Sequence, residues 1–145
     1  MSLLNEGFQN IKVEKLNNRI LSRVTIQRPN NPPYECKALW DTGADLSSIT
    51  QLAFDNINPP MTNNKTNVGG YGGRDKDKET YLIHVTVMPG VEIPLQVFIH
   101  PNSKRPDGSL KDEYGIIIGM DIKEHLNFAI TSIEKEMQLF LRQLK

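Results

Sequence analysis

The stretch "KALWDTGADLSSIT" (residues 37–50) brings an apolar run to a sudden stop at an acid. The run Ala-Leu-Trp is typical of the end of a buried strand, and Asp41 stands where that strand ends. An ionised carboxylate is costly to bury without partners, so this acid needs either a turn to hold it or a function. Small and apolar residues resume after Gly43, which predicts that the chain turns tightly and re-enters the core at once.

A plain turn is the simplest interpretation of Asp41-Thr42-Gly43 when the tripeptide is taken alone. Asp and Gly are frequent turn residues, and Asp-Thr-Gly often occurs by chance. The choice between a structural turn and a catalytic acid therefore depends on what else the chain carries.

The composition is that of a globular protein with one domain. The chain has 145 residues, enough to bury a core, and 38% of them are hydrophobic and 23% charged. Seventeen basic and seventeen acidic side chains cancel, which argues against nucleic acid or a membrane surface as the main partner. The sequence has no apolar window of about 18 residues and no signal-peptide pattern at its start, so we expect a cytoplasmic protein without a membrane span.

The cysteine and histidine residues predict neither a disulfide nor a metal site. Cys36 is the only cysteine, which excludes an internal disulfide. The three histidines, His84, His100 and His125, are far apart, and one cysteine cannot build a zinc site. We therefore expect no metal and no cofactor.

Alternation with a period of two residues predicts a mainly β protein. Residues 20–26, 81–87 and 93–99 each place apolar side chains at every second position. This pattern is typical of half-buried strands in an antiparallel sheet or barrel. Turn signals separate these segments, at "RPNNPP" (28–33), "INPPMTNN" (57–64) and "MPG" (88–90).

Helix is scarce, and the second half of the chain holds the best candidate. Residues 121–126 form a short predicted helix, with Asp121 as N-cap and Glu124 three residues on, as a capping box requires. Two further strands are expected to close the chain, "LNFAITS" (126–132) and "MQLFLRQL" (137–144). The polar segment 100–113 is a predicted loop, long enough to be functional or mobile.

A glycine-rich motif, "NVGGYGG" (67–73), follows the acid, and its glycines lie 28 to 32 residues after Asp41. Four glycines around one aromatic residue permit unusual backbone angles and close approach of the backbone to a ligand. Strand-like sequence follows, which predicts a hairpin tip that acts as a mobile cover. A phosphate-binding loop is the rival interpretation, but neither phosphate motif is present and no helix follows. A merely structural glycine turn stays open when the motif is taken alone.

A third motif, "GIIIGMDI" (115–122), predicts a fully buried strand that stops abruptly at Gly119, just before the short helix. Taken alone, this motif indicates only a core strand followed by a helix cap.

Taken together and in this order, the three motifs resemble the retropepsin family of aspartic proteases, in its cellular and bacterial branch. "ALWDTGADLSSI" is similar to the catalytic segment of that family, "NVGGYGG" to its flap tip and "IIIGMDI" to the segment that closes its ψ-shaped loop. The resemblance runs from about Ile20 to Phe128. It implies a single-domain acid-protease β-barrel over residues 1–145, with one short helix and strand extensions at both ends.

The mechanism implied by the resemblance needs two carboxylates that share one proton, because both cannot ionise at close range. The sequence has no second Asp-Thr-Gly or Asp-Ser-Gly, Asp107 lies in a polar loop, and Asp121 is better interpreted as a helix cap. The second carboxylate must therefore come from another copy. A C2 homodimer with Asp41 of each subunit at the axis is expected, and a polypeptide is the expected substrate.

The resemblance also assigns roles to individual residues. Asp41, Thr42 and Gly43 are implied as catalytic, with Thr42 locking the geometry of the acid pair. Gly119 and Asp121 are implied as structural. The implied substrate-binding residues are Ala44, Asp45, Ser47, Gly69, Gly70, Tyr71, Gly72, Gly73, Ile117 and Ile118.

Two departures from viral members are visible. Met120 stands where viral members carry an arginine that pairs with the acid matched to Asp45, and the chain continues well beyond Phe128, where viral chains stop and build their dimer interface. Two other interpretations stay open. One is a catalytically weak peptide-binding module with the same fold, and the other is an unrelated small β-barrel in which the motifs occur by accident. An intact Asp41-Thr42-Gly43 favours the enzyme, since a pure binder has no need of a buried acid pair.

Overall fold

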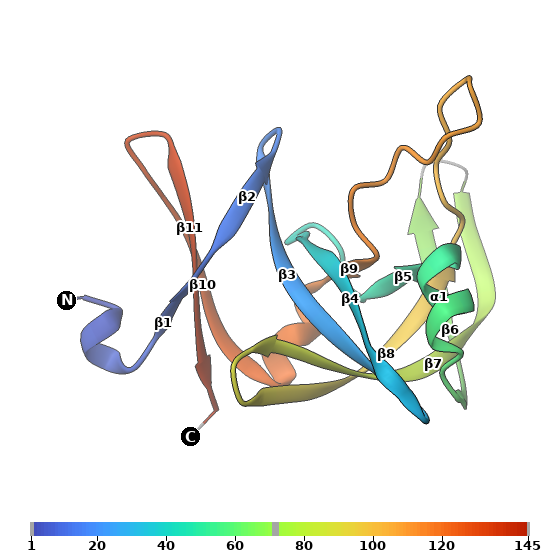
Figure 1. Cartoon of the computed structure of the whole chain (residues 1–145), viewed down its shortest axis with the longest axis horizontal. Coiled ribbons are helices and arrows are strands. Elements are labelled where there is room, and N and C mark those ends of the chain that lie inside the picture. The colour runs from blue at the N-terminus through green and yellow to red at the C-terminus, as the bar shows by residue number, and fades with distance from the viewer. Residues whose placement is uncertain (1, 71–72, 145) are drawn as a thin grey trace.

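In a computed structural model, which describes residues 2–70 and 73–144, the chain is mainly strand (Figure 1). The helices are the short 3-10 helices η1 (Leu4–Glu6) and η2 (Met120–Glu124) and the α-helix α1 (Gln51–Ile57). The strands are β1 (Gln9–Ile11), β2 (Val13–Leu16), β3 (Arg19–Arg28), β4 (Asn31–Trp40), β5 (Ser48–Thr50), β6 (Met61–Gly70), β7 (Gly73–Met88), β8 (Val91–His100), β9 (Ile116–Ile118), β10 (Leu126–Ile133) and β11 (Glu136–Gln143).

The larger sheet has eight strands in the order β2-β3-β4-β9-β5-β8-β7-β6. An additional antiparallel pairing between β3 and β7 connects strands that are far apart in this order, so the sheet curls back on itself. The three alternating segments of the sequence fall on β3, β7 and β8, and their predicted inward faces are buried. The prediction of half-buried strands in a mainly β fold is therefore confirmed.

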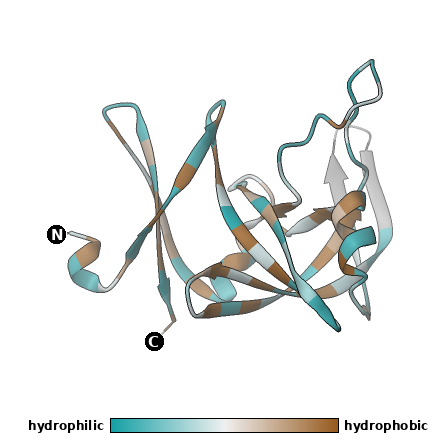
Figure 2. Ribbon diagram, in the orientation of Figure 1, coloured by the Kyte–Doolittle hydropathy of each residue, from teal (hydrophilic) through white to brown (hydrophobic). Residues whose placement is uncertain are grey.

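The hydrophobic core fills the curled sheet and extends under the smaller one. Apolar residues colour the inner strands in Figure 2, whereas the loops and strand ends are polar. β8 shows the alternation most clearly, because Ile93, Leu95 and Val97 are buried and the residues between them are exposed. Leu126, Leu139 and Leu141 of the smaller sheet belong to the same core, so the two sheets share one hydrophobic interior.

The smaller sheet has three strands in the order β1-β11-β10 and lies to the left in Figure 1. β10 and β11 form the predicted terminal hairpin, and Glu134 and Lys135 take up positive φ angles at its tight turn. β1 pairs with β11 along Gln9–Ile11, so both ends of the chain meet in this sheet. Phe128 of β10 contacts the ring of Trp40, which links this sheet to the end of β4.

Two turn predictions were too wide. The first turn occupies only two residues, Pro29 and Asn30, and β4 begins at Asn31. Residues 57–64 hold the end of α1 and the start of β6 rather than one long turn, and α1 itself was not predicted. Thr50 caps α1, because its hydroxyl oxygen accepts a hydrogen bond from the Ala53 N–H at 3.2 Å. The third turn, at Pro89-Gly90, is confirmed.

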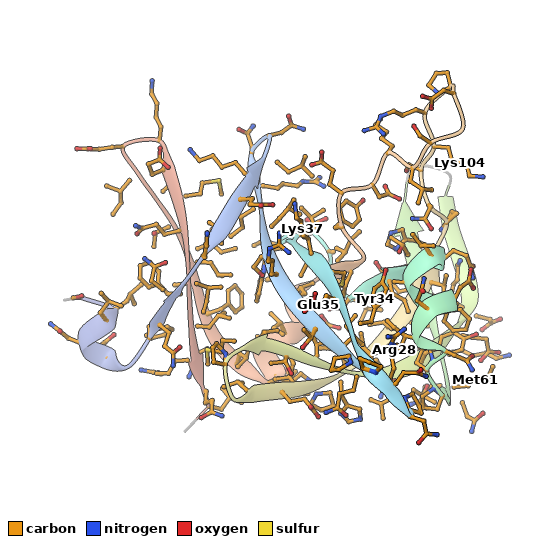
Figure 3. The ribbon with its side chains drawn as sticks, in the orientation of Figure 1. Arg28, Tyr34, Glu35, Lys37, Met61 and Lys104 are labelled. Atoms are coloured by element: carbon orange, nitrogen blue, oxygen red, sulfur yellow. The ribbon has the colours of Figure 1, made fainter. Side chains whose placement is uncertain are left out.

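The predicted helix at 121–126 is also corrected. It is the 3-10 helix η2, its N-cap position is Gly119, and no side chain caps it. The capping box of Asp121 and Glu124 was therefore wrong, because the Asp121 carboxylate bonds elsewhere. The prediction of a loop at 100–113 is confirmed, with one isolated bridge between Lys104 and Leu110. This loop stands out from the sheets at the upper right, where Figure 3 labels Lys104.

In the part of the chain that the structure describes, no helix is long and apolar enough to cross a membrane.

The thiol of Cys36 is expected to be inert in the folded protein. Cys36 is partly buried against Gly115, where a Cβ atom would lie 3.0 Å from the sulfur. Burial raises the pKa of the thiol to about 12, so the reactive thiolate is almost absent at pH 8. Iodoacetamide at pH 8 should label the folded chain very slowly and the chain unfolded in guanidinium rapidly, as measured by mass spectrometry. Equal labelling rates in the two states would contradict this account.

Candidate active site

Asp41 follows directly on β4, and β9 holds it in place. The last residues of β4 pair in parallel with β9, with Trp40 beside Ile118. The Asp41 N–H continues this ladder by donating to the Ile118 carbonyl oxygen at 2.9 Å. The backbone of the acid is therefore fixed by a buried strand, which is the setting that the apolar run before it predicted.

The turn that follows is closed by the acid itself. One carboxylate oxygen, Oδ1 of Asp41, accepts the Gly43 N–H at 3.0 Å, and the Ala44 N–H donates to the Asp41 carbonyl oxygen at 3.2 Å. A side chain at Gly43 would lie 3.3 Å from Oδ1, so glycine leaves this oxygen uncrowded. Asp41 is partly buried, whereas Thr42 and Gly43 are exposed. The tripeptide is thus a braced turn that presents its acid at the surface of one chain.

A second chain segment passes close to this turn. The Met120 N–H donates to the Ala44 carbonyl oxygen at 2.7 Å, and the Asp121 N–H donates to the Asp45 carbonyl oxygen at 3.2 Å. Gly119 sits where the two segments touch, since a Cβ atom there would lie 2.7 Å from the Leu46 oxygen and 2.8 Å from the Ala44 oxygen. Any larger residue would push the segments apart. The close contact between the two segments therefore requires glycine at position 119.

The Asp121 carboxylate grips Ser47 with both oxygens. The Ser47 hydroxyl donates to Oδ1 at 2.7 Å and the Ser47 N–H donates to Oδ2 at 3.0 Å. The Ser47 hydroxyl oxygen also accepts the Gly119 N–H at 3.1 Å. Ser47 is fully buried, so it braces the turn from within and is not exposed for the substrate contact that was predicted. The Asp121 side chain bonds to Ser47 and does not cap η2.

The remaining predicted residues are spread over three places. Ile117 is partly buried and faces away from the core, whereas Ile118 is 1% exposed and belongs to the core. Ala44 is partly buried and Asp45 is exposed, both on the turn. The hairpin of β6 and β7 carries Gly69, Gly70 and Gly73 at its far end, with Gly70 paired to Gly73. Tyr71 and Gly72 lie outside the described residues.

Sequence reasoning missed two side chains near the turn. The Trp40 indole N–H donates to the Ser22 hydroxyl at 2.9 Å inside the core, which fixes the residue just before Asp41. Ser22 interrupts the apolar face of β3, and a lone polar residue on such a face is the signal that could have suggested this bond. Tyr114, just before β9, is the other: burial raises the pKa of its phenol, and the charge of Asp41 contributes to the same shift.

Charged groups near Tyr114 shift the pKa of its phenol. The negative charge of Asp112 raises the pKa of Tyr114 more than Asp41 does, and Arg19 lowers it. The His100 ring lies 6.3 Å from the Tyr114 ring, and burial lowers the pKa of His100. Neither ring nitrogen of His100 has a partner among the described residues. Arg19 and Asp41 thus act on Tyr114 with opposite effects on its pKa.

Two hollows lie beside β4, but Asp41 lines neither of them. The smaller, of about 360 Å³, is lined by β4 residues that Figure 3 labels, Tyr34, Glu35 and Lys37, and by the 100–113 loop. The larger, of about 720 Å³, is a groove between β1–β2 and the turn that joins β7 to β8. Asp41 is thus partly buried and lies outside both of these hollows.

Within residues 2–70 and 73–144, no group of three His, Cys, Asp or Glu side chains could hold a metal ion. The chemistry available at the turn is that of a carboxylate and of backbone groups. A braced carboxylate of this kind can take up or release a proton, which is what acid–base catalysis needs.

Comparison with solved structures identifies the fold. The chain matches the EIAV protease complexed with the inhibitor HBY-793 at 22% identity, with 77% of this chain and 90% of that chain covered and a TM-score of 0.50. It also matches a retropepsin-like aspartic protease from Rickettsia conorii at 15% identity, with 93% and 90% covered and a TM-score of 0.54. No protein-family model and no curated protein sequence matches the chain. The fold of the chain is retropepsin-like.

The grip of Asp121 on Ser47 should contribute measurably to stability. Asp121→Asn replaces one acceptor oxygen by an amide that cannot accept, and Ser47→Ala removes the hydroxyl. Because hydrogen bonds to charged groups are strong, each change should lower the free energy of unfolding by about 2 kcal/mol. The double variant should lose less than the sum, since both changes break the same contact. Urea unfolding measures all three.

Glu124→Gln is the control for this grip, because Glu124 is exposed and was the other half of the predicted capping box. It should leave the unfolding free energy almost unchanged. A large loss for Glu124→Gln together with a small one for Asp121→Asn would support the capping box instead.

Proposed function

We propose that, on this retropepsin-like fold, two copies of the chain form an aspartic endopeptidase. The observation that carries the proposal is the turn at Asp41, where β9 fixes the backbone of the acid and the Gly43 N–H orients its partly buried carboxylate. A carboxylate that is held in place in this way is suited to act as a general acid or base. Both matched structures are described as proteases, one of them in complex with an inhibitor.

The proposal needs a second copy because one chain offers one such acid. Asp107 is exposed in the 100–113 loop, and its carboxylate is hydrogen-bonded to Ser109. Both oxygens of Asp121 are taken up by Ser47. In the described part of the chain, Asp41 is therefore the acid best suited to the role. A twofold axis beside Asp41 would bring two identical carboxylates together, as an isologous dimer does for any residue at its axis.

In the proposed mechanism the two Asp41 carboxylates share one proton, since like charges at short range cannot both ionise. The ionised partner accepts a proton from a water molecule as that water attacks the peptide carbonyl carbon. The protonated partner donates to the carbonyl oxygen, where negative charge develops. The hydrogen bond from the Gly43 N–H to Oδ1 supports these roles, because it orients the Asp41 carboxylate without occupying its other oxygen.

Polypeptide binding is proposed for the exposed rim of the turn and for the hairpin of β6 and β7. Thr42 would bond across the two turns, and Ala44 and Asp45 would meet the substrate backbone. Ile117 supports an apolar pocket because its side chain faces away from the core. The glycines at 69–73, with Tyr71, would close over the peptide as a flap. We also propose that residues 1–145 act as one domain and that the protein is cytoplasmic.

A second candidate function is a peptide-binding module with little turnover. The observation that favours it is the small sheet, in which β1 and β11 pair within one chain. Viral members use their chain ends to build the dimer interface, so ends that are already paired leave fewer strands for a partner. If the chain stays monomeric, it lacks the second acid. The mass of the protein in solution therefore separates the two candidates.

Asp41→Asn tests the proposed enzyme directly. The variant keeps an oxygen for the Gly43 N–H but loses the ionisable acid, so the fold should persist. Because acid–base groups contribute strongly to rate, peptide hydrolysis should fall by roughly a hundredfold to ten-thousandfold. Asp107→Asn, at an exposed aspartate of the 100–113 loop, is the matched control and should retain full activity. Sedimentation should give twice the chain mass for all three proteins. Undiminished hydrolysis by Asp41→Asn, or a strict monomer that still hydrolyses peptides, would overturn the mechanism.

The pH dependence of hydrolysis provides an independent test of the acid pair. One of the two carboxylates must keep a proton, so kcat/KM should be highest on the acid side of neutrality and should fall as the pH rises and that proton is lost. The profile is obtained from initial rates on one peptide between about pH 4 and pH 9. This range of about five pH units covers the region around the ordinary pKa values of carboxyl and histidine side chains. A rate that rises steadily into the alkaline range would contradict a shared proton.

A further inference from the structure

We propose that the site at the Asp41 turn selects peptides with a basic side chain, and that the Asp45 carboxylate is the group that selects them. This inference rests on the proposed function, because it places the substrate along the turn at Asp41. It adds a class of substrate that the acid pair alone does not define.

Asp45 is held at the site by its backbone while its side chain is exposed. Its carbonyl oxygen accepts the Asp121 N–H at 3.2 Å, and the carbonyl oxygen of the residue before it accepts the Met120 N–H at 2.7 Å. These two bonds fix the backbone of Asp45 against the start of η2. The side chain is exposed on the same turn as Asp41, four residues further along the chain. A carboxylate so placed borders any peptide that reaches Asp41.

The Asp45 carboxylate has no partner within the described residues, since no hydrogen bond and no ion pair joins it to them. Three other aspartates have partners within the protein: Asp121 is held by Ser47, Asp112 by Asn102 and Ser103, and Asp55 by Gln51. Within the described residues, the Asp45 carboxylate is therefore available to accept hydrogen bonds from a bound peptide.

The neighbouring residue at the start of η2 is uncharged. The Met120 N–H donates to the carbonyl oxygen of the residue before Asp45, and the Met120 thioether carries no charge. Within the described residues no ion pair joins Asp45 to a cation. A lysine or arginine of the bound peptide would supply one.

Peptides are distinguished because the Asp45 carboxylate changes the binding free energy by a different amount for each kind of peptide side chain. A basic side chain gains a charge-assisted hydrogen bond, an apolar side chain leaves the carboxylate to be desolvated, and an acidic side chain is repelled. The ionised member of the acid pair adds negative charge to the same site. Arg19 acts electrostatically on Tyr114 together with Asp41, but no ion pair joins Arg19 to Asp45 among the described residues.

Binding to the inactive Asp41→Asn protein tests this selection without any need for turnover. Peptides of one sequence, with either Lys or Gln at each position in turn, are compared by Kd. At one position Lys should bind about fivefold more tightly than Gln, as expected of a single, partly screened charge pair. Adding Asp45→Asn should abolish the ratio, and raising the salt concentration should reduce it. Asp55→Asn, an exposed acid on α1, is the matched control and should leave the ratio unchanged.

Met120→Arg provides a second, independent variant, because it supplies the missing cation inside the protein. In the same inactive background it should reduce the Lys-to-Gln ratio at the position that Asp45→Asn affects. A ratio near one at every position for the Asp41→Asn protein would overturn the inference. So would a ratio that survives both Asp45→Asn and Met120→Arg.

Two further readouts separate this inference from the proposed function. Hydrolysis by the unaltered chain tests the enzyme alone, and a selective but inactive protein would retain the inference while removing the mechanism. The mass of Asp45→Asn in solution tests whether the acid serves the dimer instead. Loss of the dimer in Asp45→Asn, with no effect of Met120→Arg on peptide choice, would assign Asp45 to the subunit interface and overturn the inference.

Discussion

The close contact between Gly119 and the backbone of residues 44–46 is the constraint on which the site depends. Two carbonyl oxygens lie 2.7 and 2.8 Å from the position that a Cβ atom would occupy, so only glycine lets the two segments meet. Their meeting allows the bonds from Met120 and Asp121 to the turn and the bond from Gly119 to Ser47. Without this contact, the segment after the Asp41 turn would lose its bonds to Met120, Asp121 and Gly119, and the support that a functional group receives from its surroundings would be weaker.

The two aspartates next to this contact, Asp41 and Asp121, use their carboxylates differently. Asp121 is consumed in bracing, because both of its oxygens accept from Ser47. In the part of the chain that the structure describes, the Asp41 carboxylate accepts one hydrogen bond, from the Gly43 N–H to Oδ1. A reactive acid must be held in place and must also keep a carboxylate oxygen available for substrate. A side chain that made all the bonds that brace the turn would have no oxygen left. Here the bracing bonds to Ser47 are made by Asp121 instead of Asp41.

Local sequence patterns predicted the strands and the main elements of the site, but not the bonds between distant segments. β3, β7 and β8 were predictable because each buries one face, and alternation records that directly. Asp121 was misassigned because a local capping pattern competed with Ser47, which lies 74 residues away in the chain and meets it only after folding. α1 was missed because seven residues with an exposed Leu52 give a weak helical pattern, and only the Thr50 cap signals it.

The exposed turn has a consequence for how two copies could meet. Thr42 and Gly43 present backbone and hydroxyl groups to solvent, and burying such groups without partners is unfavourable. A partner of arbitrary shape would leave them unsatisfied, whereas an identical turn related by a twofold axis offers each donor a matching acceptor. The small sheet pairs β1 with β11 within one subunit, so in the proposed dimer the turn itself would have to provide part of the recognition between subunits. A contact through Thr42 would then lie one residue from Asp41 and would bring the two acids together.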